Sequence, residues 1–144
     1  MDQVSLKDIK ISKLKQIPTI GGDVLKAMNN NDKGYNNFGE AYFSWIKFNS
    51  IKAWKFHKEM TLNLIVPFGK VRFVFFIPKQ KNKFKIIEIG ENISEYKRIT
   101  VPPKICFGFK GLAKNKSLIL NIANIKHSSD ESIKYELDYC NYQW

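Results

Sequence analysis

The sequence predicts an all-β fold with little helix, an antiparallel sandwich or barrel. Short runs of β-branched and aromatic residues recur along the chain, and turn-forming residues separate them at short intervals. In addition, no stretch repeats apolar residues with the period of an amphipathic helix. We therefore expect roughly eight to ten short strands joined by tight turns.

The chain is organised around a meander of three strands, expected at residues 51–57, 61–66 and 71–77. A Pro-Phe-Gly turn is expected between the second strand and the third. The third strand, VRFVFFI, is β-branched or aromatic almost throughout, which suits a strand buried on both faces. Pro67 and Pro78 bracket this strand, because proline has no N–H to give to a ladder.

The remaining elements are shorter or more polar. Residues 29–37 (NNNDKGYNN) are expected to form a loop, and residues 23–28 a strand or a helical turn. Asp130 and Glu131 fall in a loop where their carboxylates are expected to be solvated, and the aromatic tail, residues 135–144, is expected to pack against the body. The other expected strands cover residues 8–17, 38–48, 84–89, 96–101, 105–109 and 117–125.

The length of 144 residues and the hydrophobic content of 44% predict one domain with a sizeable core. We assign residues 1–37 to an N-terminal strand and loops, and residues 38–144 to the main barrel. The sequence lacks a run of roughly 18 apolar residues that would predict a membrane span. The N-terminus lacks the apolar core of a signal peptide, and Cys106 and Cys140 have no metal-ligand spacing. The expectation is therefore a reduced, cytoplasmic protein.

The formal net charge of +11 has two candidate uses. A nucleic-acid-binding protein would cluster its basic residues to contact phosphates. Here they are nearly all lysines, with only Arg72 and Arg98 as arginines, and they are spread along the whole chain. We therefore favour a positive field that attracts an anionic, phosphorylated small molecule over nucleic acid.

The chain contains no motif of metal or nucleophilic chemistry. His57 and His127 stand alone, without the paired spacing of metal ligands. Neither a GxSxG elbow nor a glycine-rich phosphate loop is present. Cys106 is flanked by apolar residues and is expected to be a buried small side chain. The sequence therefore predicts no metal and no cofactor, and motif spacing alone specifies no reaction.

Five segments between about residue 38 and residue 144 carry a family resemblance. In order they are IKAWKFH, GKVRFV, ITVPPKICFGFKGL, LILNIANIKH and NYQW. Their order and spacing resemble RmlC-like cupins, the dTDP-4-dehydrorhamnose 3,5-epimerases, and more closely the short, divergent relatives of these enzymes in surface-polysaccharide gene sets. The resemblance implies a cupin jelly-roll barrel, a homodimer formed by β-strand exchange, and binding of a nucleotide-linked keto sugar.

Most of the family's catalytic positions hold other residue types in this chain. Lys55 takes the place of the catalytic base histidine, and His57 follows two residues later, on the same side of the strand. Leu62, Phe73 and Phe107 take the places of a lysine, an aspartate and a histidine. The resemblance implies that the acidic residue that orients the base would lie beyond the last segment matched here.

Three interpretations remain open. A metal-independent epimerase or isomerase would transfer protons with Lys55 or His57 and would have an open cavity lined by both. Its expected substrate-binding residues are Lys52, Trp54, Arg72, Phe73 and Phe107. A catalytically silent sugar-binding or partner-subunit cupin would instead have a lumen packed with Leu62, Leu64, Phe73, Phe75 and Phe107. A basic nucleic-acid-binding barrel would gather lysines on one face beside exposed aromatic residues.

Overall fold

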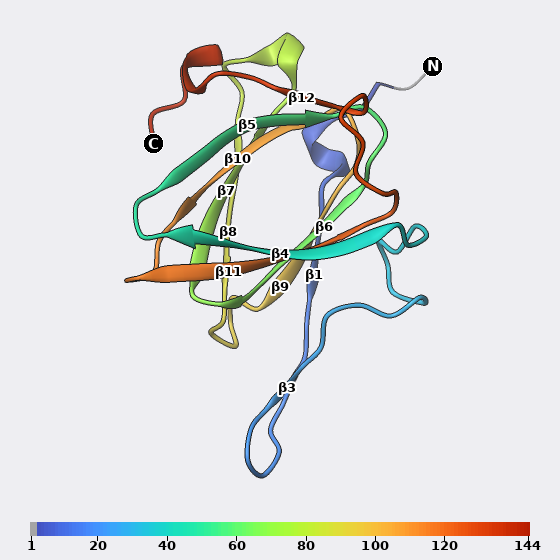
Figure 1. Ribbon diagram of the computed structural model, residues 1–144, viewed down its shortest axis with the longest axis vertical. Coiled ribbons are helices and arrows are strands. Elements are labelled where there is room, and N and C mark those ends of the chain that lie inside the picture. Colours follow the sequence, from blue (N-terminus) through green and yellow to red (C-terminus); the bar gives the residue numbers. More distant parts are fainter. Residues whose placement is uncertain (1–2) are drawn as a thin grey trace.

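Two antiparallel five-stranded sheets, packed face to face, form the body of the protein (Figure 1). The computed structural model describes residues 3–144. The first sheet has the order β1 (Lys10–Lys13), β9 (Lys97–Val101), β6 (Leu62–Phe68), β11 (Lys116–Ala123) and β4 (Glu40–Lys47). The second has the order β12 (Ser132–Lys134), β5 (Ile51–His57), β10 (Cys106–Gly111), β7 (Lys70–Phe76) and β8 (Lys85–Gly90). The predicted all-β sandwich is confirmed.

Helical structure within the described residues is limited to three single 3-10 turns. They are η1 (Leu6–Asp8), η2 (Pro78–Gln80) and η3 (Leu137–Tyr139). The third lies in the C-terminal tail, beyond β12. No helix in residues 3–144 has the length and apolar content needed to cross a membrane.

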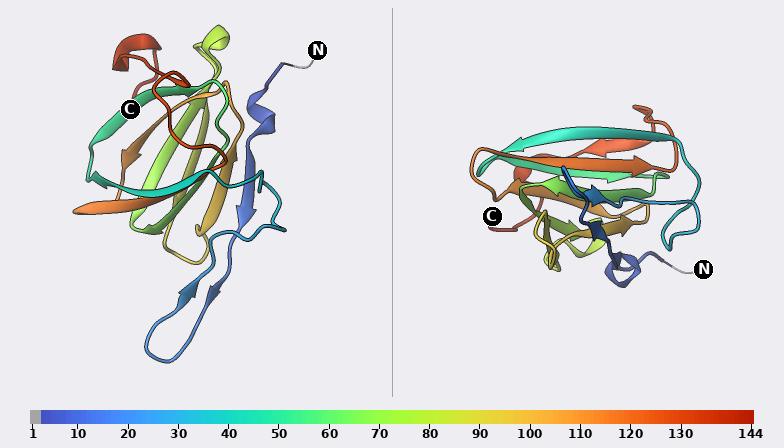
Figure 2. Two further views of the ribbon diagram at one scale, coloured as in Figure 1. Left: turned by 45° about the vertical axis from the view of Figure 1, so that its right-hand side comes forward. Right: turned by 90° about the horizontal axis from the view of Figure 1, so that it is seen from below.

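The N-terminal region forms an arm that projects away from the sandwich (Figure 2). The arm consists of β2 (Gln16–Ile17) and β3 (Val24–Leu25), so the single strand expected at residues 8–17 is divided between β1 and β2. The chain then returns along the first sheet, where the buried Arg98 side chain donates hydrogen bonds to the carbonyl oxygens of Ala27, at 2.7 Å, and Lys33, at 2.9 Å. These bonds attach the returning loop to β9.

The predicted central meander corresponds to β5, β6 and β7, but Pro67 lies inside β6 rather than in the turn. At this point β6 contains an extra residue relative to β11, because Leu118 pairs with Phe68 and Leu120 with Ile65. Such a bulge leaves a position outside the regular ladder, which suits a residue without an N–H. Gly69, at φ 87°, then makes the tight turn into β7.

The main core fills the space between the two sheets. Phe73 and Phe75 of β7 are both 0% exposed and pack there against aliphatic residues of the first sheet. The members of this core from β6, β9 and β11 are Leu62, Leu64, Val66, Ile99, Val101, Ile119 and Ala123. Large apolar side chains therefore close the deep part of the barrel lumen.

A second cluster, which we call the outer aromatic cluster, lies on the opposite side of the second sheet. Its buried members are Trp54, Val74, Phe76 and Cys106. The tail covers them with the partly buried rings of Tyr135, Tyr139, Tyr142 and Trp144. The predicted packing of the tail against the body is confirmed, and this packing is the reason that β7 is buried on both faces.

Candidate functional site

A buried histidine–carboxylate pair, His57 and Glu131, lies at the end of β5. His57 is the last residue of β5 and pairs with Ser132 of β12. Glu131, the residue before Ser132, therefore lies beside the His57 imidazole. His57 Nδ1 and Glu131 Oε1 are 2.8 Å apart, and the two residues are only 3% and 5% exposed. Glu131 Oε2 accepts hydrogen bonds from the backbone N–H groups of Glu59, at 3.1 Å, and Met60, at 2.9 Å. Both carboxylate oxygens are therefore held in place.

Burial and these hydrogen bonds set the charge state of the pair. Burial lowers the pKa of His57 below its ordinary value of 6.5, and Glu131 offsets this effect only in part. Burial also opposes ionisation of Glu131, but hydrogen bonds from His57 and the backbone outweigh it and hold the pKa of the carboxyl below its usual value. At neutral pH the pair is therefore a neutral imidazole and a carboxylate.

The carboxylate also selects the imidazole tautomer. Because an ionised carboxylate can only accept, Nδ1 carries the proton and Nε2 keeps a free lone pair. Within residues 3–144, Nε2 has no hydrogen-bond partner. A neutral imidazole oriented by a carboxylate, with a free second nitrogen, is the arrangement of a general base.

A cavity of about 300 Å³ opens between the edges of the two sheets, beside this pair. The first sheet contributes Tyr42, Ser44, Leu64, Ile119 and Asn121. The second sheet contributes Lys52, Lys55, Phe107, Phe109 and Lys134. The volume lies at the lower end of the roughly 300–1,000 Å³ of small-molecule sites.

The second-sheet wall of the cavity is basic and aromatic. Lys55 and Lys134 are paired residues of β5 and β12, and Lys52 Nζ reaches the carbonyl oxygen of Trp45 at 2.9 Å. The rings of Phe107 and Phe109 are stacked, with centroids 6.3 Å apart. Three ammonium groups beside an aromatic surface suit an anionic ligand that contains a ring.

The opposite wall presents a hydroxyl, that of Tyr42 on β4. The Tyr42 oxygen accepts a hydrogen bond from Asn121 Nδ2 at 3.0 Å, which leaves its own O–H free to donate. The Asn121 amide is itself fixed, because its Oδ1 accepts from the backbone N–H of Asn63 at 3.3 Å. The cavity therefore has a basic wall on one sheet and a hydroxyl donor on the other.

Comparison with solved structures identifies the fold. A dTDP sugar isomerase from Desulfovibrio desulfuricans matches with a TM-score of 0.90 at 28% identity, covering 96% of this chain and 91% of that chain. QdtA, a sugar 3,4-ketoisomerase from Thermoanaerobacterium thermosaccharolyticum in complex with TDP, matches with a TM-score of 0.75 at 18% identity, covering 94% and 93%. This is the RmlC-like fold of dTDP-sugar epimerases and isomerases.

A third match within the RmlC-like fold is a dTDP-4-dehydrorhamnose 3,5-epimerase from Sulfolobus tokodaii. Its TM-score is 0.79 at 18% identity, covering 98% of this chain and 84% of that chain. No protein-family model matches the sequence. No curated protein matches it either. The structural match confirms the resemblance that the order of the sequence segments indicated.

The RmlC-like fold brings three of the predicted site residues together. Lys52, Lys55 and Phe107 all line the cavity. His57 lies next to it rather than on its surface, because its ring stacks on that of Phe107, with centroids 6.2 Å apart and an interplanar angle of 23°. The structure thus combines an open mouth lined by Lys55 with a deep lumen packed by Leu62, Phe73 and Phe75.

The side chains of the other three predicted binding residues are engaged away from the cavity. Trp54 borders the cavity, but its ring is 1% exposed and packs in the outer aromatic cluster, where it cannot stack on a ligand. Arg72 Nε pairs with Glu88 at 2.8 Å, away from the cavity lining. Phe73 is 0% exposed within the core. The alternation of strand residues places Trp54 on the side opposite its neighbour Lys55, as observed, whereas the bulge in β5 brings Lys52 to the side of Lys55.

Glu131 is the functional residue that the sequence interpretation missed. The expectation that its carboxylate is solvated is wrong, because the residue directly precedes β12 and β12 pairs with β5. A signal was present: residues 132–135 (SIKY) alternate polar and apolar side chains, which indicates a short strand. Cys106 behaves as expected, since burial raises the pKa of its thiol to about 12.

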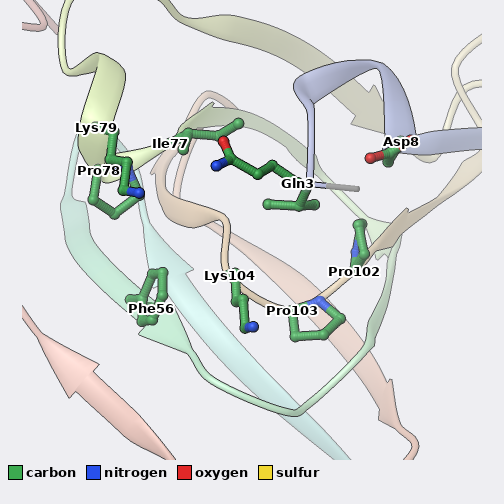
Figure 3. A pocket seen from close by; sticks show the side chains of 10 residues that line it. Gln3, Asp8, Phe56, Ile77, Pro78, Lys79, Pro102, Pro103 and Lys104 are labelled. Atoms are coloured by element: carbon green, nitrogen blue, oxygen red, sulfur yellow. The ribbon is translucent and has the colours of Figure 1, made fainter. Parts of the chain in front are cut away.

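A larger cavity, of about 690 Å³, lies where β9 and β7 end (Figure 3). Its walls are mainly Phe56, Ile77 and three prolines, and the ammonium groups of Lys79 and Lys104 lie at its edge. His57 and Glu131 line neither cavity, but the smaller one is lined by Phe107, whose ring stacks on that of His57. Within residues 3–144 there is also no group of three His, Cys, Asp or Glu side chains placed to hold a metal ion. We therefore assign the candidate site to the smaller cavity.

Proposed function

We propose that this protein is an isomerase or epimerase of nucleotide-linked keto sugars in which His57 is the base. The observation that carries this proposal is the buried pair of His57 and Glu131 beside the lysine-lined cavity. The imidazole lies one aromatic ring away from the cavity, because Phe107 lines the cavity and stacks on His57. The polysaccharide pathway and the cytoplasmic location are further parts of the proposal, and they rest on the sequence resemblance.

The proposed chemistry is proton transfer next to a ketone. His57 Nε2 takes a proton from the carbon adjacent to the carbonyl, and the C–H electrons form the enolate. The carboxylate of Glu131 stabilises the imidazolium, while the ammonium of Lys55 or the hydroxyl of Tyr42 stabilises the enolate oxygen. In an isomerisation, the hydroxyl proton of the neighbouring carbon moves to the enolate oxygen, and the imidazolium returns its proton to the former carbonyl carbon, which leaves the ketone at the neighbouring position. In an epimerisation, a donor on the opposite face, for which the Tyr42 hydroxyl is the candidate, protonates the same carbon, and the imidazolium releases its proton to water.

We assign the base role to His57 rather than Lys55 because only His57 has an orienting partner. Glu131 fixes its tautomer and compensates the positive charge that it acquires. Within residues 3–144, no carboxylate forms an ion pair with Lys55, so its ammonium remains available for an anionic ligand. Phe107 must shift to admit a substrate to Nε2, because its stacked ring lies on the cavity side of the imidazole.

The proposed substrate class is a thymidine-diphosphate-linked keto sugar. One QdtA structure is in complex with TDP and a variant of QdtA with TDP-4-keto-6-deoxyglucose. In this chain, Lys52, Lys55 and Lys134 supply the positive charge that a diphosphate requires. Phe109 supplies an apolar surface for the sugar or the base.

We also propose that the protein is a homodimer. The outer face of β4 exposes Phe43 (63%) and Trp45 (47%), and Phe68 (51%) lies beside Trp45 with ring centroids 6.3 Å apart. β4 is an edge strand of the first sheet, so its backbone is also unpaired on one side. An exposed aromatic patch on an edge strand suits a second copy of the same chain.

Product analysis tests the proposed reaction. The protein is incubated with TDP-4-keto-6-deoxyglucose and the products are followed by proton NMR. A 3-keto product identifies a ketoisomerase and an inverted ring carbon identifies an epimerase. A rise in melting temperature without turnover would instead favour the catalytically silent cupin, in which Phe107 keeps the base closed off. The absence of both effects would contradict the proposal.

A further inference from the structure

The lysine-lined wall depends on an irregular stretch of β5. Phe107 of β10 pairs with Lys55, and Phe109 pairs with Lys52, so two steps along β10 correspond to three steps along β5. In a regular strand, residues three apart face opposite sides. The extra residue in β5 places Lys52 and Lys55 on the same side, where both line the cavity with Phe107 and Phe109.

Trp54 lies within this bulge and faces away from the cavity. Its indole N–H donates a hydrogen bond to the carbonyl oxygen of Leu137 in η3, at 3.1 Å. Its ring packs edge-on against Phe76, with centroids 4.9 Å apart, and lies tilted by 34° against Trp144, with centroids 5.3 Å apart. The backbone of Trp54 is also fixed, because it exchanges two hydrogen bonds with Tyr135, of 2.9 and 3.1 Å.

Gly108 provides the space that this arrangement needs. It lies between Phe107 and Phe109, opposite the bulge. A Cβ atom at Gly108 would lie 2.9 Å from Cε3 of the Trp54 ring and 2.5 Å from the Cβ of Ala53. Any side chain at this position would therefore displace the indole or the bulge.

We propose that Trp54 is a positioning residue for the two cavity lysines: anchored to Leu137 of the C-terminal tail, its indole holds the β5 bulge that keeps Lys52 and Lys55 on the ligand side of the strand. This inference rests on the proposed function for the identity of the ligand but not for the geometry. The tail, which runs above β5 at the top of Figure 1, thus sets the charge pattern of a cavity on the other side of the sheet.

The test compares Trp54→Phe with Trp144→Phe. Both substitutions shorten an aromatic ring of the same cluster, fully buried in Trp54 and partly buried in Trp144. Within residues 3–144 the Trp144 indole nitrogen has no hydrogen-bond partner, so only Trp54→Phe removes a bond to the tail. The crystal structure of each variant gives the β5–β10 register. Calorimetric titration gives the ratio of the dissociation constants for thymidine and TDP, which measures recognition of the diphosphate and is independent of global stability.

We expect Trp54→Phe to lose the pairing of Lys52 with Phe109 and to reduce the thymidine-to-TDP ratio by about tenfold, the size of one lost charged contact. Trp144→Phe should keep the pairing of Lys52 with Phe109 and the wild-type ratio of dissociation constants. An unchanged register in Trp54→Phe would overturn the inference, whatever the titrations give. If the register changes in Trp54→Phe but the wild type itself does not prefer TDP to thymidine, Trp54 is a positioning residue and the proposed ligand is wrong. If Trp54→Phe does not fold, Gly108→Ala can replace it in the test, because the added Cβ displaces the indole without changing its chemistry.

Discussion

Replacing Glu131 by glutamine tests the roles of the two residues of the buried pair. The substitution keeps the shape of the side chain and removes its charge. The Gln oxygen can continue to accept from the backbone N–H groups of Glu59 and Met60, which places its NH₂ group against Nδ1 of His57. Because NH₂ only donates, Nδ1 must become the acceptor and the proton must move to Nε2. The nitrogen that serves as the base is then blocked.

The magnitude follows from the contacts that are lost. A hydrogen bond between a buried charged group and its partner contributes about 1.5–3 kcal/mol, so the folded state should be destabilised by an amount in this range. Loss of the correctly oriented base should reduce turnover by roughly 10²- to 10⁴-fold. Glu131 also raises the pKa of His57 against the effect of burial, so the variant should have an even lower His57 pKa.

The assay combines a rate with a titration. Turnover of TDP-4-keto-6-deoxyglucose is measured between pH 4.5 and about 8, and the imidazole C–H signal of His57 is followed by NMR over the same range. In the profile of turnover against pH, we expect Glu131→Gln to have a much lower plateau than the wild type, and its rate to fall on the acid side at a lower pH. His127, which is exposed, provides a control, since His127→Asn should leave the plateau unchanged and, by removing the weakest influence on the His57 pKa, should move the acid limb of the profile only slightly, to higher pH. A Glu131→Gln variant with a wild-type plateau would refute the assigned roles.

Four further results are expected. The pKa of His57 is below 6.5 in the folded state, so on acidification the unfolded chain binds the proton before the folded protein does. The urea midpoint should therefore fall as the pH drops below 6.5, and the part of this fall that is due to His57 should be absent in His57→Asn. Lys55→Ala should weaken TDP binding about tenfold in calorimetric titrations, whereas Lys10→Ala, on exposed β1, should not. Phe73→Ala should cost about 3–5 kcal/mol in urea unfolding because the ring is fully buried. Phe43→Ser should convert a dimer to a monomer in light scattering, and a monomeric wild type that binds single-stranded DNA would favour the nucleic-acid interpretation instead.

The fold could be predicted from the sequence because its strands have strong local signals. The aromatic and β-branched runs that became β5, β6 and β7 were recognisable, and so was the tail that covers them. Short elements were less accessible: β12 has only three residues and follows a polar loop, so pairing with β5, rather than local propensity, stabilises it. The position of Glu131 depends on that pairing.

The composition of the site was only partly predictable for the same reason. Lys55 and His57 were identified from the strand that carries them, and their common side follows from the two-residue period. The period fails across the bulge, which brings Lys52 to the side of Lys55, whereas Trp54 follows the period and is buried on the opposite side of the sheet from the ligand for which it was predicted. Tyr42 was not identified, because its role depends on Asn121 of another strand.

Deuterium exchange tests the central claim most directly. TDP-4-keto-6-deoxyglucose is incubated with the protein in deuterium oxide, and the label at carbon next to the ketone is measured by mass spectrometry. We expect the wild type and His127→Asn to catalyse incorporation, and His57→Asn to reduce it to the rate without protein. Incorporation that persists at the wild-type rate in His57→Asn would show that His57 is not the base, and a wild type without incorporation would contradict the proposed chemistry itself.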